Sequence, residues 1–394
     1  MRKGAAMRDK QKLIQDAMDR AVANKEIAGV NMLVFHQGKE EYYAQSGYSN
    51  LDKKRPMDRD TICHLYSQTK PITAAATMLL LQDGVIDLNQ PVGDFIDSFK
   101  EQTCLIDGNI EKVPSDKHVR IIDLLNMTSG LVYPGLGTRA EAATTLLFTD
   151  GINRLNSDDQ LTTMEFAERI GTFPLQFIPG SFFQYGTSAD VLGAVIEKVS
   201  GQKYGEFLQE RLFDPLEMVD TGFYVPKDKL PRMSEIYKKH QGKLVSFDGD
   251  HLIIRSDGGF NRFESGGAGL FSTLDDYMHF GQMLLNNGTY KGKEILTPET
   301  VKFLTCSSLT PMQQRAFDNW QGLEGYTYGN LMRVMTNPEQ AVLISHKGEY
   351  GWDGWLGAYF MNDPATQTTF IMLTQMYDYA TGPLTRKLRN IIFS

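Results

Sequence analysis

Segments with strand character lie near both ends of this chain, and helical patterns fill the region between them. Residues 29–48 read as two strands around the turn Gln37-Gly38, which predicts a β-hairpin. Residues 340–346, 355–363 and 366–376 carry the apolar, β-branched and aromatic side chains typical of strands. We therefore expect an α+β fold in which both ends of the chain build one antiparallel sheet flanked by helices.

The region between the strands shows the spacing of amphipathic helices. Apolar residues recur there every three or four positions, and a similar pattern covers residues 9–24. We expect one unit, 1–394, without independent domains, made of a sheet-containing subdomain (1–84 and 265–394) and a mainly helical subdomain (85–264). The segments predicted as helices in the middle region are 121–131, 162–170, 189–201 and 204–213.

Composition excludes several classes of function. The net charge is −8 and the chain has no basic cluster, which argues against a nucleic-acid partner. The three cysteines show no metal-type spacing and imply no disulfide framework. The histidines lack metal-site spacing and the glycine-rich stretches lack a following lysine-serine pair, so we expect neither a metal nor a cofactor. The charged N-terminus and the absence of a membrane-length apolar run predict a cytoplasmic protein without a membrane partner.

A serine and a lysine three residues apart open the helical segment at 64–84. Ser67 and Lys70 would share one helix face, close enough for an amine to take a hydroxyl proton. Pro71 is best tolerated in a first turn, which predicts that the helix begins near Ser67. The hydroxyl would then lie at the positive end of the helix dipole. One feature opposes this, because a residue before proline, here Lys70, is biased away from helical angles.

The S-x-x-K pattern is weak by itself, because the chain contains a second copy. Ser200 and Lys203 straddle Gly201, which follows a helical apolar stripe and is a candidate C-cap. We therefore interpret Ser200 as a structural residue at a helix end.

A serine nucleophile also needs a base and an oxyanion site. Two later stretches could supply them: residues 179–201, where Tyr185 precedes a helix with Ser188 as its expected cap, and the glycine-rich residues 347–364. A third glycine-rich stretch, 258–269, is equally compatible with a cradle near the site and with an ordinary loop.

Together these motifs resemble the class C β-lactamase and penicillin-binding-protein group, and within it the family VIII carboxylesterases. The resemblance rests on Ser67-Gln68-Thr69-Lys70, on Tyr185 and on Trp352-Asp353-Gly354, in that order, and spans roughly residues 10–390. The esterases carry a YSxxxDVLG-type motif, matched from Tyr185 to Gly193 except that Gly186 replaces the serine. Their W-x-G motif is matched by Trp352, Asp353 and Gly354.

The resemblance implies a role for each matched residue. Ser67 would form an acyl-enzyme that water hydrolyses, and Lys70 and Tyr185 would share proton transfer, in an order that the sequence leaves open. The backbone N–H groups of Ser67 and Trp355 would form the oxyanion hole. The substrate, a small ester, would contact the segment Trp352, Asp353, Gly354 and Trp355.

Two departures separate this chain from enzymes specialised for β-lactams. Thr187 stands where asparagine is frequent, and Trp352 stands where a lysine would meet the carboxylate of the drug. Both favour a neutral ester. A β-lactamase or D-alanyl peptidase remains the alternative, and a non-catalytic binding module is a third hypothesis. A Ser-His-Asp hydrolase is excluded because no G-x-S-x-G motif occurs.

Overall fold

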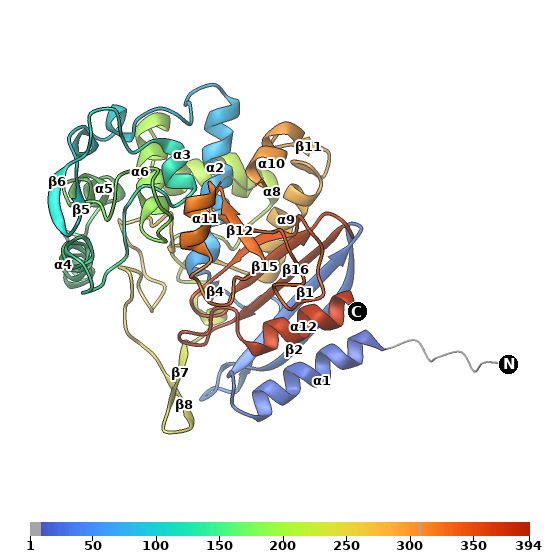
Figure 1. Ribbon diagram of the computed structural model, residues 1–394. Helices are drawn as coiled ribbons and strands as arrows, with labels where there is room; N and C mark the ends of the chain where they lie inside the picture. Colours follow the sequence, from blue (N-terminus) through green and yellow to red (C-terminus); the bar gives the residue numbers. More distant parts are fainter. Residues whose placement is uncertain (1–8, 307–308) are drawn as a thin grey trace.

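One large antiparallel sheet, built from both ends of the chain, underlies the fold (Figure 1). The computed structural model describes residues 9–306 and 309–394. Within them the strand order is β12-β13-β14-β15-β16-β1-β2-β3, which confirms the predicted α+β fold. The strands are β1 (Gly29–His36), β2 (Lys39–Asn50), β3 (Arg55–Pro56), β12 (Tyr326–Gly329), β13 (Met332–Met335), β14 (Tyr350–Asp353), β15 (Tyr359–Asp363) and β16 (Thr368–Thr374).

Strand β1 joins the two ends of the chain. It pairs with β2 through the predicted turn, where Gln37 and Gly38 have φ of 50° and 74°. Positive φ at both central residues is what a tight type I′ hairpin requires. On its other side β1 pairs with β16, with Leu33 opposite Ile371.

The C-terminal strands differ in part from the prediction. Residues 340–346 are irregular, so that predicted strand is wrong, and the hairpin β12–β13 was not predicted. The strand expected from residue 355 begins only at Tyr359, because Gly354 to Ala358 form the turn that joins β14 to β15. The tryptophan of the W-x-G motif therefore lies inside a strand.

Helices cover both faces of the sheet (Figure 1). The terminal helices α1 (Lys10–Ala23) and α12 (Pro383–Phe393) pack side by side over one face, where Val30, Met32 and Val34 point. Helix α9 (Leu274–Leu285) packs on β1, β15 and β16 over the other face, and α2 (Lys70–Gln82) contacts β14. The intervening Leu33 belongs to that second core, as the alternation of a strand requires.

The middle region is mainly helical and packs around α6 (Ser188–Ser200), which contacts α2, α3, α5 and α7. The division into two subdomains stays a prediction. The remaining helices are α3 (Ile121–Leu125), α4 (Arg139–Arg154), α5 (Thr163–Gly171), α7 (Tyr204–Leu208), α8 (Asp214–Leu216), α10 (Pro298–Leu304) and α11 (Pro311–Phe317). The short strands are β4 (Cys63–His64), β5 (Thr103–Ile106), β6 (Asn109–Lys112), β7 (Tyr237–His240), β8 (Lys243–Ser246), β9 (Phe271–Ser272), β10 (Thr289–Tyr290) and β11 (Lys293–Glu294).

Helix α6 also explains the second S-x-x-K copy. Gly201 has φ 71° and caps the helix, as predicted, and the hydroxyl of Ser200 donates to the carbonyl of Ile196. At the other end the N-cap is Thr187, and Ser188 is the first helical residue, so the predicted cap was one residue late. The Ser188 hydroxyl instead shares a hydrogen bond with Ser129.

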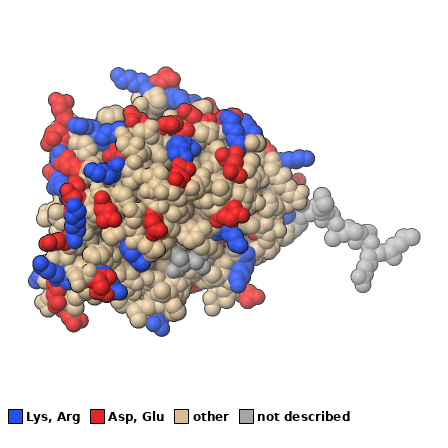
Figure 2. Space-filling view, turned by 90° about the horizontal axis from the view of Figure 1, so that it is seen from above, with Lys and Arg blue, Asp and Glu red and all other residues tan. Residues whose placement is uncertain are grey.

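Charges of both signs alternate over the face seen from above, and neither sign forms a continuous patch on its described part (Figure 2). No helix among the described residues has the length and apolar character needed to cross a membrane. The three cysteines are all free, and Cys63 and Cys104 are buried.

Candidate active site

Ser67 lies in a single 3₁₀ turn, Tyr66–Thr69, that leads directly into α2. The α-helix begins at Lys70, three residues later than predicted. Lys70 has φ −58° and ψ −43°, so it is helical although Pro71 follows it. Tyr66, directly before the serine, has φ 46°, in the left-handed region that a bulky residue rarely adopts. The turn therefore holds the serine in a locally strained backbone at the N-terminal tip of a buried helix.

The amine of Lys70 is the centre of a polar network. Its Nζ lies 3.1 Å from Ser67 Oγ, 3.0 Å from the Tyr133 hydroxyl and 2.8 Å from the carbonyl oxygen of Gly267. The side chain is fully buried, and this burial lowers the pKa of Lys70 to about 7, although the carboxylate of Asp190 acts in the opposite direction. A substantial fraction of the amine is therefore neutral at neutral pH.

The carbonyl of Gly267 is held in place by Asp190, the aspartate of the second motif. The buried Asp190 carboxylate accepts from the Ser265 hydroxyl (2.5 Å) and from the Gly267 N–H (3.1 Å). Burial raises the pKa of Asp190, and the hydrogen bonds and Lys70 oppose that rise. Ser265 and Gly267 belong to the second half of the glycine-rich stretch 258–269, so this half forms part of the site.

Tyr185 lies in the loop before α6, and its ring faces the amine. Lys70 Nζ is 4.6 Å from the ring centroid of Tyr185, and the indole N–H of Trp352 donates to the Tyr185 hydroxyl at 3.0 Å. Burial raises the pKa of Tyr185, while hydrogen bonding to Ser67 and Trp352 lowers it. The phenol is therefore neutral and fixed toward the serine.

The loop around Tyr185 also explains the departure from the esterase motif. A Cβ at Gly186 would lie 2.2 Å from the carbonyl oxygen of Leu131 and 2.8 Å from Val132 Cα. Only glycine allows the backbone to approach so closely. The serine found at this position in the motif does not fit this loop without a shift.

Tyr133 belongs to the site and was missed by sequence reasoning. Its hydroxyl contacts Lys70, and its ring centroid lies 5.6 Å from that of Tyr185. It comes from the loop between α3 and α4, one of 17 tyrosines, in a stretch with no motif of its own. Only the tertiary packing of that loop beside the Tyr185 loop brings it to the lysine.

Strand β14 and its turn lie directly against the serine. A Cβ at Gly354 would be 2.1 Å from the carbonyl oxygen of Leu65, two residues before Ser67. This close approach places the next residue, Trp355, beside Ser67. The carboxylate of Asp353 lies 3.5 Å from the buried guanidinium of Arg333, and burial raises the pKa of Asp353.

These residues surround a cavity of about 580 Å³. Ser67, Tyr185, Trp352, Asp353 and Trp355 all line it, whereas Lys70 lies buried behind its wall and Gly354 supplies backbone. Trp320, which follows α11, was not predicted, and with it all three tryptophans of the chain line the cavity. The other lining residues are Tyr66, Tyr133, Pro134, Thr145, Phe148, Thr149, Ile152, His251, Leu252, Asp378 and Ala380.

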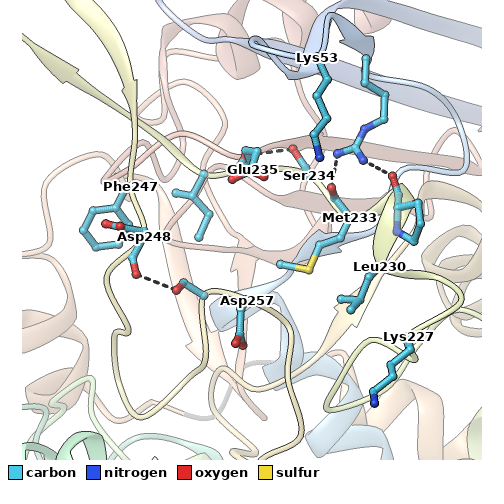
Figure 3. Close-up of a pocket in the computed structure, with 13 residues that line it drawn as sticks. Lys53, Lys227, Leu230, Met233, Ser234, Glu235, Phe247, Asp248 and Asp257 are labelled. Carbon is cyan, nitrogen blue, oxygen red and sulfur yellow. Dashed lines mark hydrogen bonds between the residues drawn. The ribbon is translucent and has the colours of Figure 1, made fainter. Parts of the chain in front are cut away.

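A second cavity, of about 700 Å³, lies away from this chemistry (Figure 3). None of the predicted site residues lines it. The guanidinium of Arg55 lies in its wall and donates to the carbonyl groups of Pro231 and Met233, so these N–H groups are satisfied within the protein. The reactive groups of the predicted motifs therefore lie at the Ser67 cavity alone among the described residues.

Comparisons with known proteins place this chain among serine hydrolase relatives of the same fold. The family model described as Beta-lactamase matches residues 11–388. The chain is 30% identical to Protein Rv1367c of Mycobacterium tuberculosis, over 89% of this chain and 86% of that protein. It is 28% identical to Esterase EstB of Burkholderia gladioli, over 95% and 93%. The solved structure of EstCE1, described as a hydrolase with promiscuous acyltransferase activity, superimposes with a TM-score of 0.82 at 24% identity, over 98% of each chain.

Proposed function

The chain belongs to the beta-lactamase family, and we propose that this serine hydrolase is a carboxylesterase of the family VIII type. It would act on short-to-medium acyl esters through an acyl-enzyme on Ser67. One observation carries the proposal. A buried amine, Lys70, whose pKa is about 7, lies 3.1 Å from the Ser67 hydroxyl. An amine that is neutral at the working pH can accept the proton of the serine hydroxyl, whereas an ordinary lysine is already protonated at that pH and cannot.

In the proposed acylation, Ser67 Oγ attacks the ester carbonyl carbon and gives its proton to the neutral amine of Lys70. The carbonyl oxygen becomes an oxyanion, stabilised by the N–H groups of Ser67 and Trp355. The close approach of Gly354 to Leu65 supports this pairing, since it brings the two turns together.

The leaving alkoxide then takes a proton as the acyl-enzyme forms. We assign this transfer to the Tyr185 hydroxyl, which Trp352 orients. The resulting phenolate then takes a proton from the ammonium of Lys70, which returns the amine to its neutral form. Water attacks the acyl-enzyme by the reverse sequence, Ser67 recovers its proton, and the carboxylic acid leaves.

Two features support an ester rather than a β-lactam or a D-alanyl peptide, both of which carry a carboxylate. Trp352 occupies the position of the lysine that would bind this carboxylate, and no Lys or Arg is among the residues that line the cavity. The proposal includes a cytoplasmic location, which three unpaired cysteines suit because thiols persist in a reducing compartment.

The test compares initial rates on p-nitrophenyl acetate, butyrate and octanoate with the rate on nitrocefin, a chromogenic cephalosporin. We expect ester cleavage to dominate and to fall by at least about 10³-fold in Ser67→Ala. Ser200→Ala, in the second S-x-x-K copy, is the matched control and should retain full activity. Faster turnover of nitrocefin would establish the β-lactamase alternative. Ester cleavage that survives Ser67→Ala would overturn the mechanism.

A further inference from the structure

The cavity at Ser67 is lined by acidic side chains and by no lysine or arginine. The acidic side chains are those of two aspartates, Asp353 and Asp378. Asp353 forms an ion pair with the buried Arg333 at 3.5 Å, which compensates its charge within the protein. The uncompensated charge at the cavity is therefore that of Asp378.

Asp378 is the exposed member of the pair and lies at the mouth. It follows β16 in the segment whose next residue, Tyr379, donates its N–H to the carbonyl of Trp355 at 3.0 Å. Among the residues that the structure describes, no lysine or arginine forms an ion pair with Asp378. Its charge is therefore available to a ligand.

Aromatic rings form two walls of the same cavity. One wall joins Tyr133, Tyr185, Trp320 and Trp352, whose neighbouring ring centroids lie 4.7 to 5.7 Å apart. On it the ring of Tyr185 faces the amine of Lys70, whose nitrogen lies 4.6 Å from the ring centroid.

The second wall stacks His251 on Trp355, with centroids 4.1 Å apart and an angle of 25°, and adds Tyr66 at 5.0 Å from Trp355. Burial lowers the pKa of His251, so this ring is neutral at neutral pH. Aromatic rings beside a carboxylate form the arrangement that attracts organic ammonium ions.

We propose that the Ser67 cavity selects esters that carry a cationic ammonium group and disfavours anionic ones. The aromatic walls would surround the ammonium group, and Asp378 would attract it at the mouth while Ser67 attacks the ester carbonyl. This inference rests on the proposed esterase function for its catalytic step, but binding of the cation does not require that step.

The kinetic test uses acetylcholine and its neutral tert-butyl analogue, in which a carbon atom replaces the ammonium nitrogen, so that the two esters match in shape. We expect kcat/KM to be about tenfold higher for the cationic ester, the order expected for a desolvated cation among aromatic rings. Asp378→Asn should reduce that ratio, and Asp158→Asn, at an exposed aspartate outside the cavity, should not. Equal or faster cleavage of the neutral ester by the wild type would overturn the selectivity and leave the esterase function intact.

A binding measurement separates the two proposals. Because every tryptophan of the chain lines this cavity, intrinsic fluorescence reports on it directly. We expect tetramethylammonium chloride to change the emission saturably, and more weakly in Asp378→Asn, whereas sodium chloride at equal ionic strength should not. A response identical to that of sodium chloride would refute the ammonium site. Saturable binding without Ser67-dependent cleavage of any ester would refute the esterase and keep the ammonium site.

Discussion

Burial of the Lys70 amine has opposite consequences for the proposed catalysis and for stability. The amine is fully buried between Ser67, Tyr133 and the carbonyl of Gly267, and its pKa is lowered to about 7. In the proposed mechanism the lowered pKa supplies a neutral base, but folding must then remove a proton from the amine or bury its charge.

The rate of ester cleavage should follow the ionisation of this amine. Because the base must be neutral, kcat/KM should fall about tenfold per pH unit below about pH 7. The pKa of Tyr185 is raised, so no second fall is expected up to about pH 9. The profile is measured on p-nitrophenyl butyrate with absorbance read at the pH-independent isosbestic wavelength. A rate that stays constant down to about pH 5 would contradict a role for Lys70 as base.

The same residue gives a stability prediction. The pKa of Lys70 is 10.5 in the unfolded chain and about 7 in the folded chain. The free-energy cost of burying a protonated amine is therefore largest below pH 7, and this pH-dependent cost disappears above pH 10.5. The unfolding free energy of Lys70→Met relative to wild type should therefore fall by about 1.4 kcal/mol for each pH unit between those limits. Urea unfolding at several pH values measures this difference. A difference that does not change with pH would contradict the lowered pKa of Lys70.

The residues that motifs specify were predictable, and those that only tertiary packing supplies were not. Ser67, Tyr185 and Trp352 come from three distant segments and line one cavity, as the motif order led us to expect, while their chemical roles stay predictions. Tyr133 and Trp320 lie in loops without a local pattern, and nothing in their neighbours distinguishes them from ordinary packing residues.

At the scale of elements, the contact between β14 and the Tyr66–Thr69 turn sets the geometry of the site. Gly354→Ala would place a methyl group 2.1 Å from the carbonyl oxygen of Leu65 and force the two turns apart. We expect a loss of more than about 2 kcal/mol in stability and a large loss of kcat, because the N–H of Trp355 would leave its proposed oxyanion position.

A matched glycine makes that prediction specific. The nearest atom to a Cβ at Gly222 would be the Tyr224 carbonyl oxygen at 3.7 Å, an ordinary contact. Gly222→Ala should therefore retain stability in urea and esterase activity. Wild-type activity in Gly354→Ala would show that the two turns can separate without cost to catalysis.

The sequence analysis misplaced strand segments whose conformation depends on tertiary contacts with loops. The turn between β12 and β13 consists of Asn330 and Leu331, with φ of 48° and 63°, a pair that lacks the glycine typical of such turns. Tertiary bonds hold it, since the N–H groups of these residues donate to Asn126 Oδ1 and to the Leu125 carbonyl. Conversely, the apolar run at 340–346 has Val342 83% exposed and pairs with no strand.

At the scale of the whole molecule, a buried ion pair attaches the C-terminal helix to the sheet. Arg389 on α12 contacts Glu349, which directly precedes β14, and donates to the Tyr326 hydroxyl at 2.7 Å. Arg389 and Glu349 are 1% and 0% exposed, so neither charge can turn to water when the other is removed.

Arg389→Met should therefore destabilise the protein by about 3 kcal/mol or more in urea unfolding, because it leaves the Glu349 carboxylate buried and unpaired. Adding Glu349→Gln should recover part of that loss. Arg386→Met, on the exposed side of the same helix, is the control and should change stability by less than about 0.5 kcal/mol. A loss in Arg389→Met no larger than in the control would show that the pair contributes little.

The position of β1 between β2 and β16 has a consequence for how this protein is made. Residues 29–50 leave the ribosome long before Thr368–Thr374, the partner of β1 on its other side, is translated. At about 5–20 residues per second, the intervening chain takes some tens of seconds to synthesise. For that time the edge of β1 that pairs with β16 has no partner, and such an unpaired edge can pair with a strand of another chain.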